Sequence, residues 1–172
     1  MKTFKKSILI LMAVVAVSLT SCKKDDDGGG GGSTASGTVS AKVNGSGYTS
    51  DVLLTSAILT NSNGTSSLLI SANTMNGKNI TLSIMSFFDG VGTYNIGGGA
   101  NVFTSASYTE VDIANPTNQK TWVAPYDETV AGEIKVSEIT DTFVKGTFYF
   151  NAKSDIDGTR EITEGSFNVN LQ

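Results

Sequence analysis

Two pairs of acidic side chains have the residue types and spacing that suit a hydrolytic reaction. Asp127 and Glu128 are adjacent, and Glu161 and Glu164 are three positions apart. Two carboxyl groups across a cleft can hydrolyse a glycosidic bond, one as general acid and the other as nucleophile or base. Acids on loops and on polar strand faces are otherwise simply hydrated. A carboxylate-dependent glycoside hydrolase is therefore one alternative for the function.

The 172 residues include no histidine, which narrows the remaining chemistry. Ser-His-Asp and Cys-His nucleophiles need an imidazole, and so do the usual zinc, copper and iron sites. The stretch Asp155-Ile156-Asp157-Gly158 begins like a calcium loop, but the later ligands of such a loop are missing in register. We favour a hairpin turn there. We predict no metal site, no cofactor and no catalytic residue.

Two aromatic residues are the candidates for ligand binding. Trp122 and Tyr126 flank Pro125 in an irregular segment, 115–128, where an exposed ring could stack on a sugar or on an apolar patch of a partner. The alternative for Trp122 is that its ring fills one end of a β core. The segment itself is expected to be a loop with one short strand.

The N-terminal residues are typical of an export signal. Three lysines occur within the first six residues, and an apolar stretch, 8–17, follows. That stretch is too short to cross a bilayer as a helix, which needs roughly 20 residues. A basic start, a short apolar core and small residues before a cleavage point predict a signal peptide over 1–21. The alternative is a buried N-terminal helix.

The only cysteine, Cys22, follows this segment directly. Leu19-Thr20-Ser21-Cys22 resembles the lipobox of bacterial lipoproteins, in which the cysteine is acylated and becomes the mature N-terminus. The resemblance implies a diacylglycerol on Cys22 and a membrane anchor without a transmembrane helix. The alternative is a free thiol near the terminus.

Residues 22–36 are rich in lysine, aspartate and glycine, and this composition predicts an extended, hydrated tether. Removing 1–21 leaves nine basic and sixteen acidic residues, a formal charge of −7. Because phosphate binding needs clustered basic residues, nucleic acid is not an expected partner.

The remaining segment, 37–172, has the pattern of a β domain. Asn-Gly and Asp-Gly dipeptides, which favour hairpin turns, separate short runs in which apolar and polar residues alternate. Phe148, Phe150 and Ala152 share one face of such a run, whereas Tyr149 and Lys153 share the other. We predict a single all-β domain, an antiparallel β-sandwich or a partly closed, barrel-like meander of about nine or ten strands.

Several stretches of this domain are similar to an uncharacterised family of β-rich lipoproteins from Bacteroidota. They are "VSAKVNGSGY", "GVGTYNIGG", "AGEIKVSEITDTFVKGTFYFNA" and "EITEGSFNV", and their shared features are glycine turns and strands ending in Gly-x-Phe. The resemblance covers about 38–171. It implies a β-rich fold and the cell envelope as the location, but it assigns no site residue.

The lysine and aspartate residues after Cys22 also resemble a surface-export signal. That resemblance implies that the protein is anchored in the outer leaflet of the outer membrane and faces the cell exterior. A periplasm-facing lipoprotein is the alternative. We expect a non-enzymatic module that binds a glycan, another envelope protein or a host protein. A structural envelope lipoprotein without a small-molecule ligand is the second hypothesis, and the hydrolase is the third.

Overall fold

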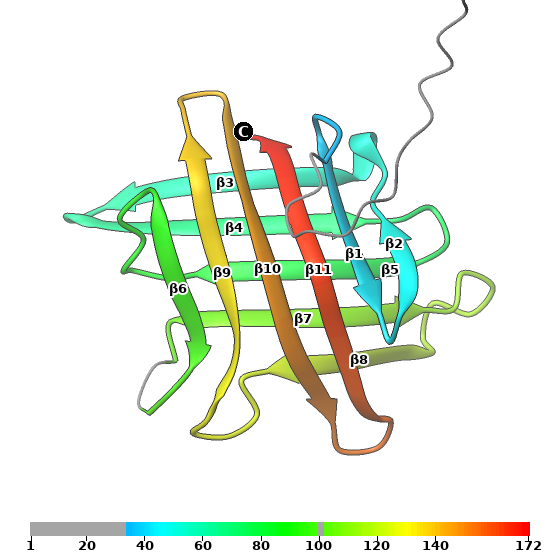
Figure 1. The fold of residues 1–172 in the computed structure, drawn as a ribbon. Coiled ribbons are helices and arrows are strands. Elements are labelled where there is room, and N and C mark those ends of the chain that lie inside the picture. Colours follow the sequence, from blue (N-terminus) through cyan, green and yellow to red (C-terminus); the bar gives the residue numbers. More distant parts are fainter. Residues whose placement is uncertain (1–33, 100–101) are drawn as a thin grey trace, which may run out of the picture.

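The computed structural model describes residues 34–99 and 102–172, and these residues form an all-β domain (Figure 1). The all-β prediction is confirmed, with eleven strands in the described residues where about nine or ten were expected. The strands are β1 Thr38–Val43, β2 Ser46–Thr49, β3 Thr55–Ser62, β4 Thr65–Asn73, β5 Lys78–Ile84, β6 Gly92–Gly97, β7 Thr104–Val111, β8 Gln119–Ala124, β9 Val130–Ile139, β10 Phe143–Ser154 and β11 Gly158–Asn170. One turn of 3-10 helix, Val52–Leu54, follows β2. The predicted signal peptide, Cys22 and the predicted tether up to Ser33 lie outside the described residues.

The strands belong to one antiparallel sheet that curls over itself into two crossing layers (Figure 1). Strands β3, β4, β5, β7 and β8 form one layer, and β6, β9, β10, β11, β1 and β2 form the other. The layers meet where Lys153 of β10 pairs with Val123 of β8, the only register pair between these strands. An isolated bridge between Ala57 and Leu171 joins the layers again at β3. The sheet is therefore partly closed, as in the barrel-like alternative.

Two of the predicted turn dipeptides form tight hairpins. Asn44-Gly45 joins β1 to β2, Asn63-Gly64 joins β3 to β4, and all four of these residues have positive φ angles. Asp89-Gly90 behaves differently, because it lies between β5 and β6, which belong to different layers. The predicted meander is interrupted there, because β6 pairs with β9 and not with β5. A turn dipeptide reverses the chain locally but does not determine which sheet edge the next strand meets.

The core lies between the two layers and follows the predicted alternation. Phe148, Phe150 and Ala152 of β10 are buried, whereas the Tyr149 side chain between them is half exposed. Residues on the inner faces of β5, β9 and β11 are buried in the same way. These include Ile80, Leu82, Ile84, Ile134, Val136, Phe167 and Val169. A period of two in side-chain direction produces this pattern wherever one face of a strand packs on the other layer.

Two buried tyrosines make the stability of the domain depend on pH. The Tyr48 hydroxyl donates to the Ala72 carbonyl oxygen at 2.5 Å, and the Tyr108 hydroxyl donates to Glu110 Oε1 at 2.8 Å. Burial is the main cause that raises both pKa values above the ordinary 10.0. A raised pKa in the folded state gives stability that is complete below the unfolded pKa and is lost as pH rises above it.

We therefore expect the free energy of unfolding to fall as the pH rises above about 10. Urea unfolding between about pH 9 and about pH 11.5 measures this slope. A Tyr48→Phe, Tyr108→Phe double variant should have a shallower slope, because it lacks the two buried hydroxyl groups whose pKa values differ between the folded and unfolded chains. An equal slope in the two proteins would contradict the prediction.

Candidate functional site

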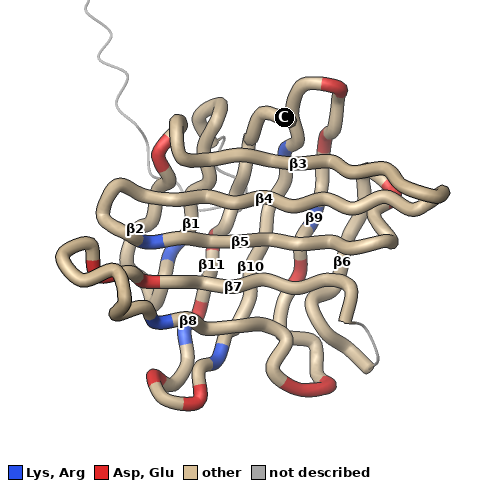
Figure 2. The backbone as a smooth tube through the Cα atoms, turned by 180° about the vertical axis from the view of Figure 1, so that it is seen from behind, with Lys and Arg blue, Asp and Glu red and all other residues tan. Residues whose placement is uncertain are grey.

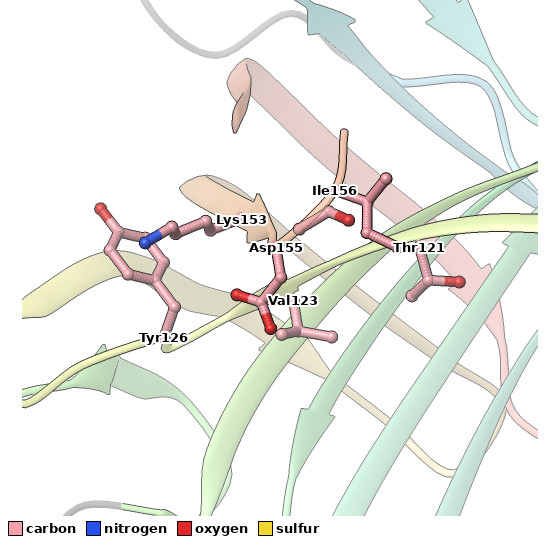
Figure 3. A pocket seen from close by; sticks show the side chains of 7 residues that line it. Thr121, Val123, Tyr126, Lys153, Asp155 and Ile156 are labelled. Atoms are coloured by element: carbon pink, nitrogen blue, oxygen red, sulfur yellow. The ribbon is translucent and has the colours of Figure 1, made fainter. Parts of the chain in front are cut away.

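A shallow depression of about 500 Å³ lies where β8 and β10 separate (Figure 3). Thr121 and Val123 of β8 line one side, and Tyr126 follows β8 after Pro125. Lys153 and Ser154 at the end of β10, with Asp155 and Ile156 of the next turn, line the other side. Because β8 and β10 share one register pair only, their ends diverge beyond it and leave this space open.

The predicted binding residue Tyr126 is a wall of this depression. Its side chain is 43% exposed, and the Lys153 Nζ lies 5.8 Å from the centre of its ring. Figure 3 shows the Asp155 carboxylate directed into the space between Tyr126 and Val123. An aromatic ring, an ammonium group and a carboxylate therefore surround one space that is open to solvent.

This arrangement suits a ligand that has both an apolar face and several hydroxyl groups. The exposed ring of Tyr126 can pack on the C–H face of a sugar, and the exposed side chains of Val123 and Ile156 extend the apolar surface. The Asp155 carboxylate can accept hydrogen bonds from hydroxyl groups, and the Lys153 ammonium can donate them.

Trp122, the other candidate, is not part of this depression. Its side chain is completely buried, and its Nε1 donates to the Asp157 carbonyl oxygen at 3.3 Å. The guanidinium carbon of Arg160 lies 4.0 Å from the centre of the ring, and the Tyr108 ring is 5.7 Å away. A surface ligand cannot stack on a covered ring, so the core alternative holds for Trp122. On β8 the alternation places Trp122 inward.

The two acid pairs lie on the outside of the domain. The hydroxyl and amide of Thr129 donate to Asp127 Oδ1 at 2.6 and 2.8 Å and lower the pKa of Asp127. A glycosidase general acid needs the opposite shift. Glu164 sits at a β-bulge of β11 and pairs with Lys42 Nζ at 2.8 Å. Every Asp and Glu in the two described ranges is at least partly exposed.

Residues 155–157 form the turn between β10 and β11, and Gly158 begins β11, as expected for a hairpin. Asp157 pairs with Lys120 Nζ at 2.7 Å, so this carboxylate already has a cation partner. Within the part of the chain that the structure describes, no three potential metal-ligating side chains lie together.

A second concave region, which no motif of the sequence predicted, lies along the short edge strand β2. It consists of two adjoining depressions of about 410 and 250 Å³ that share Gly47, Tyr48 and Lys78. The smaller one also brings Glu110 and Arg160 together. Its side chains come from strands distant in sequence, so no local signal could have found it. The same is true of Lys153 and Asp155 at the first depression.

Figure 2 shows how the charges are distributed over the domain. Strands β3 and β4 contain no charged residue, whereas several charged residues lie on β8 and in the turns near it. The Tyr126 depression lies among these charges. No helix among the described residues is long and apolar enough to cross a bilayer.

Fold and site together define a small all-β domain with a curled antiparallel sheet and a shallow, solvent-facing depression at one end. Residues 35–169 match the family model described as "Domain of unknown function (DUF6252)", and the chain belongs to this family. No curated protein and no solved structure matches the chain.

Proposed function

We propose that the protein is a lipid-anchored binding module on the outer surface of a bacterial outer membrane, and that it captures a glycan without chemical reaction. The observation that carries the ligand class is the Tyr126 depression, where an exposed ring, Lys153 and Asp155 surround one open space. The anchor rests on the lipobox-like residues that end at Cys22. The bacterial source, of Bacteroidota type, rests on the resemblance of the β domain and of the residues after Cys22.

The position of the site supports this proposal. The Gly37 amide donates to the Asn168 carbonyl oxygen at 2.7 Å, and Asn168 pairs with Lys145 near the start of β10. The Tyr126 depression lies at the opposite end, beside Lys153. Eight residues of strand at about 3.3 Å each separate these positions by roughly 26 Å. The point where the N-terminal segment joins the domain and the depression therefore lie at opposite ends of the domain, so an N-terminal anchor leaves the depression free for a ligand.

Cys22→Ser should release the protein from membranes. Without a thiol to acylate, the chain loses the acyl chains, which contribute about 0.8 kcal/mol per buried CH₂ group. Fractionation of cells that express either protein measures the change, and mass spectrometry of the native chain should show the acyl mass on Cys22. An unmodified thiol in native material would contradict the anchor.

Tyr126→Ala should weaken glycan binding at least about tenfold, which corresponds to roughly 1.4 kcal/mol, because the stacking surface is removed. Tyr126→Phe keeps the ring and should keep most of the affinity. Tyr149→Ala is the matched control, since Tyr149 is 50% exposed on β10 but does not line the depression. Glycan arrays probed with the mature chain identify a ligand, and titration of that ligand gives the affinities.

If Tyr126→Ala and Tyr149→Ala reduce the affinity for the glycan equally, the depression is not the binding site. If the folded chain binds neither glycans nor envelope extracts, the structural envelope lipoprotein becomes the better proposal. If the chain cleaves a bound glycan, the hydrolase replaces the binding module.

A further inference from the structure

An exposed apolar turn lies beside the point where the N-terminal residues join the domain. Val52, Leu53 and Leu54 follow β2 as one turn of 3-10 helix, and their side chains are 54%, 86% and 43% exposed. Three consecutive large apolar residues on the surface of a small domain are unusual, because scattered single residues are the norm.

Hydrogen bonds hold this turn in place. Asp51 caps it, with Oδ1 accepting from the Leu53 amide at 2.9 Å and its carbonyl oxygen accepting from the Leu54 amide at 3.1 Å. The side chain of Asn73 on β4 donates to the Leu54 carbonyl oxygen at 2.9 Å. The turn therefore presents its side chains outward in a defined geometry.

The neighbouring β4–β5 turn adds a fourth apolar side chain. Met75 is 70% exposed, and it lines the same depression as Asp51. The Asp51 amide also donates to the Asn73 carbonyl oxygen at 2.8 Å, which keeps the two turns together. We call Val52, Leu53, Leu54 and Met75 the apolar corner.

The apolar corner lies next to the start of the described chain. A Cβ atom built on Gly37 would be 2.9 Å from Val52 Cγ1, so the backbone just before β1 packs directly on this turn. Figure 1 shows the 3-10 turn after β2 at the upper end of the domain, whereas the β10–β11 turn that carries Asp155 is at the lower end. The apolar corner and the Tyr126 depression therefore occupy opposite ends.

We propose that the apolar corner rests on the lipid bilayer and orients the domain so that the Tyr126 depression faces outward. This inference rests on the lipid anchor at Cys22 proposed above. The residues between Cys22 and Ser33 span at most about 43 Å even when fully extended. A short connection of this kind keeps the domain at a high effective concentration near the membrane, so that a contact of a few side chains is populated. A bilayer accepts apolar side chains without a specific partner surface.

The test uses the fact that acylation leaves the chain without a free thiol. In the acylated Leu53→Cys chain, the introduced cysteine is therefore the single site for an environment-sensitive fluorophore. Ile156→Cys is the matched control, since Ile156 is 92% exposed at the opposite end of the domain. Both proteins are reconstituted in phosphatidylcholine vesicles. We expect a blue-shifted emission and several-fold weaker quenching by aqueous iodide at position 53, and emission and quenching typical of water at position 156.

Water-like emission at both positions would overturn the proposal, and equal shielding at both would overturn the orientation. Shielding at position 53 without vesicles, increasing with protein concentration, would show that a second copy covers the corner and would also overturn it.

A second arrangement separates this inference from the anchor itself. A Cys22→Ser chain with an N-terminal histidine tag is held on vesicles that contain a nickel-chelating lipid, and the same two positions are labelled. The chain has no histidine of its own, so the tag alone binds the nickel. If the fluorophore at position 53 is shielded from iodide on these vesicles, the contact between the apolar corner and the bilayer is supported even if native Cys22 proves unmodified. If the fluorophore is not shielded but Cys22 is acylated in native material, the bilayer contact of the apolar corner is rejected and the lipid anchor is retained.

Discussion

Trp122→Ala should lower the free energy of unfolding by about 3–5 kcal/mol, as expected for truncating a fully buried aromatic side chain. The indole is completely buried between the layers. Its loss leaves a cavity beside the Tyr108 ring and removes the surface under the Arg160 guanidinium. It also removes the donor to the Asp157 carbonyl oxygen, which belongs to the β10–β11 turn.

Urea unfolding of the wild-type and variant chains measures this loss. Trp122→Phe should lose less, because it keeps an aromatic ring in the core. Val123→Ala is the neighbouring control: its side chain is 49% exposed, so the change should be small. A loss below about 1 kcal/mol for Trp122→Ala would show that the ring is not an essential part of the core.

Gly146→Ala should destabilise the domain by about 3 kcal/mol or more, at the upper end of the cost of overpacking a core. A Cβ atom at Gly146 would lie less than 3.0 Å from the Lys135 carbonyl oxygen on β9 and from the Phe167 ring on β11. Strand β10 is paired on both sides here, so a shift of its backbone would disturb both ladders.

Gly47→Ala is the matched control for this substitution. Gly47 also lies in a strand, but a Cβ atom there would meet nothing within 4 Å. We expect no loss of stability in this variant, because alanine restricts the unfolded chain more than glycine does. Thermal unfolding measured by circular dichroism compares the two variants, and similar midpoints would contradict the packing argument.

The same packing explains the repeated Gly-x-Phe pattern. In the register of β10 and β11, Gly146 pairs with Phe167, and Gly165 pairs with Phe148. A Cβ atom on either glycine would clash with the phenylalanine ring opposite it. Each motif therefore supplies a ring that covers the glycine of the other. The repeat was visible in the sequence, but its reciprocal pairing was not, because a pattern within one strand carries no information on register with the next.

Local signals in the sequence predicted the strand class, several turns and the buried faces. Asn44-Gly45 and Asn63-Gly64 form tight turns because both residues tolerate positive φ angles, and this is a property of the residues themselves. The alternation around Tyr149 likewise identified its buried neighbours on β10. These features depend on residues adjacent in the chain, so one sequence is enough to read them.

The candidate site could only be assembled by the fold. Trp122 and Tyr126 are four positions apart, yet the first is a core residue and the second is exposed. Lys153 meets Tyr126 only because β10 reaches from one layer to the other and touches β8 at a single pair. The residues themselves determined strand, turn and inward or outward direction, since these follow from backbone preferences and a period of two. Which strands meet was decided by the burial of all inward faces together, and that is a property of the whole curled sheet.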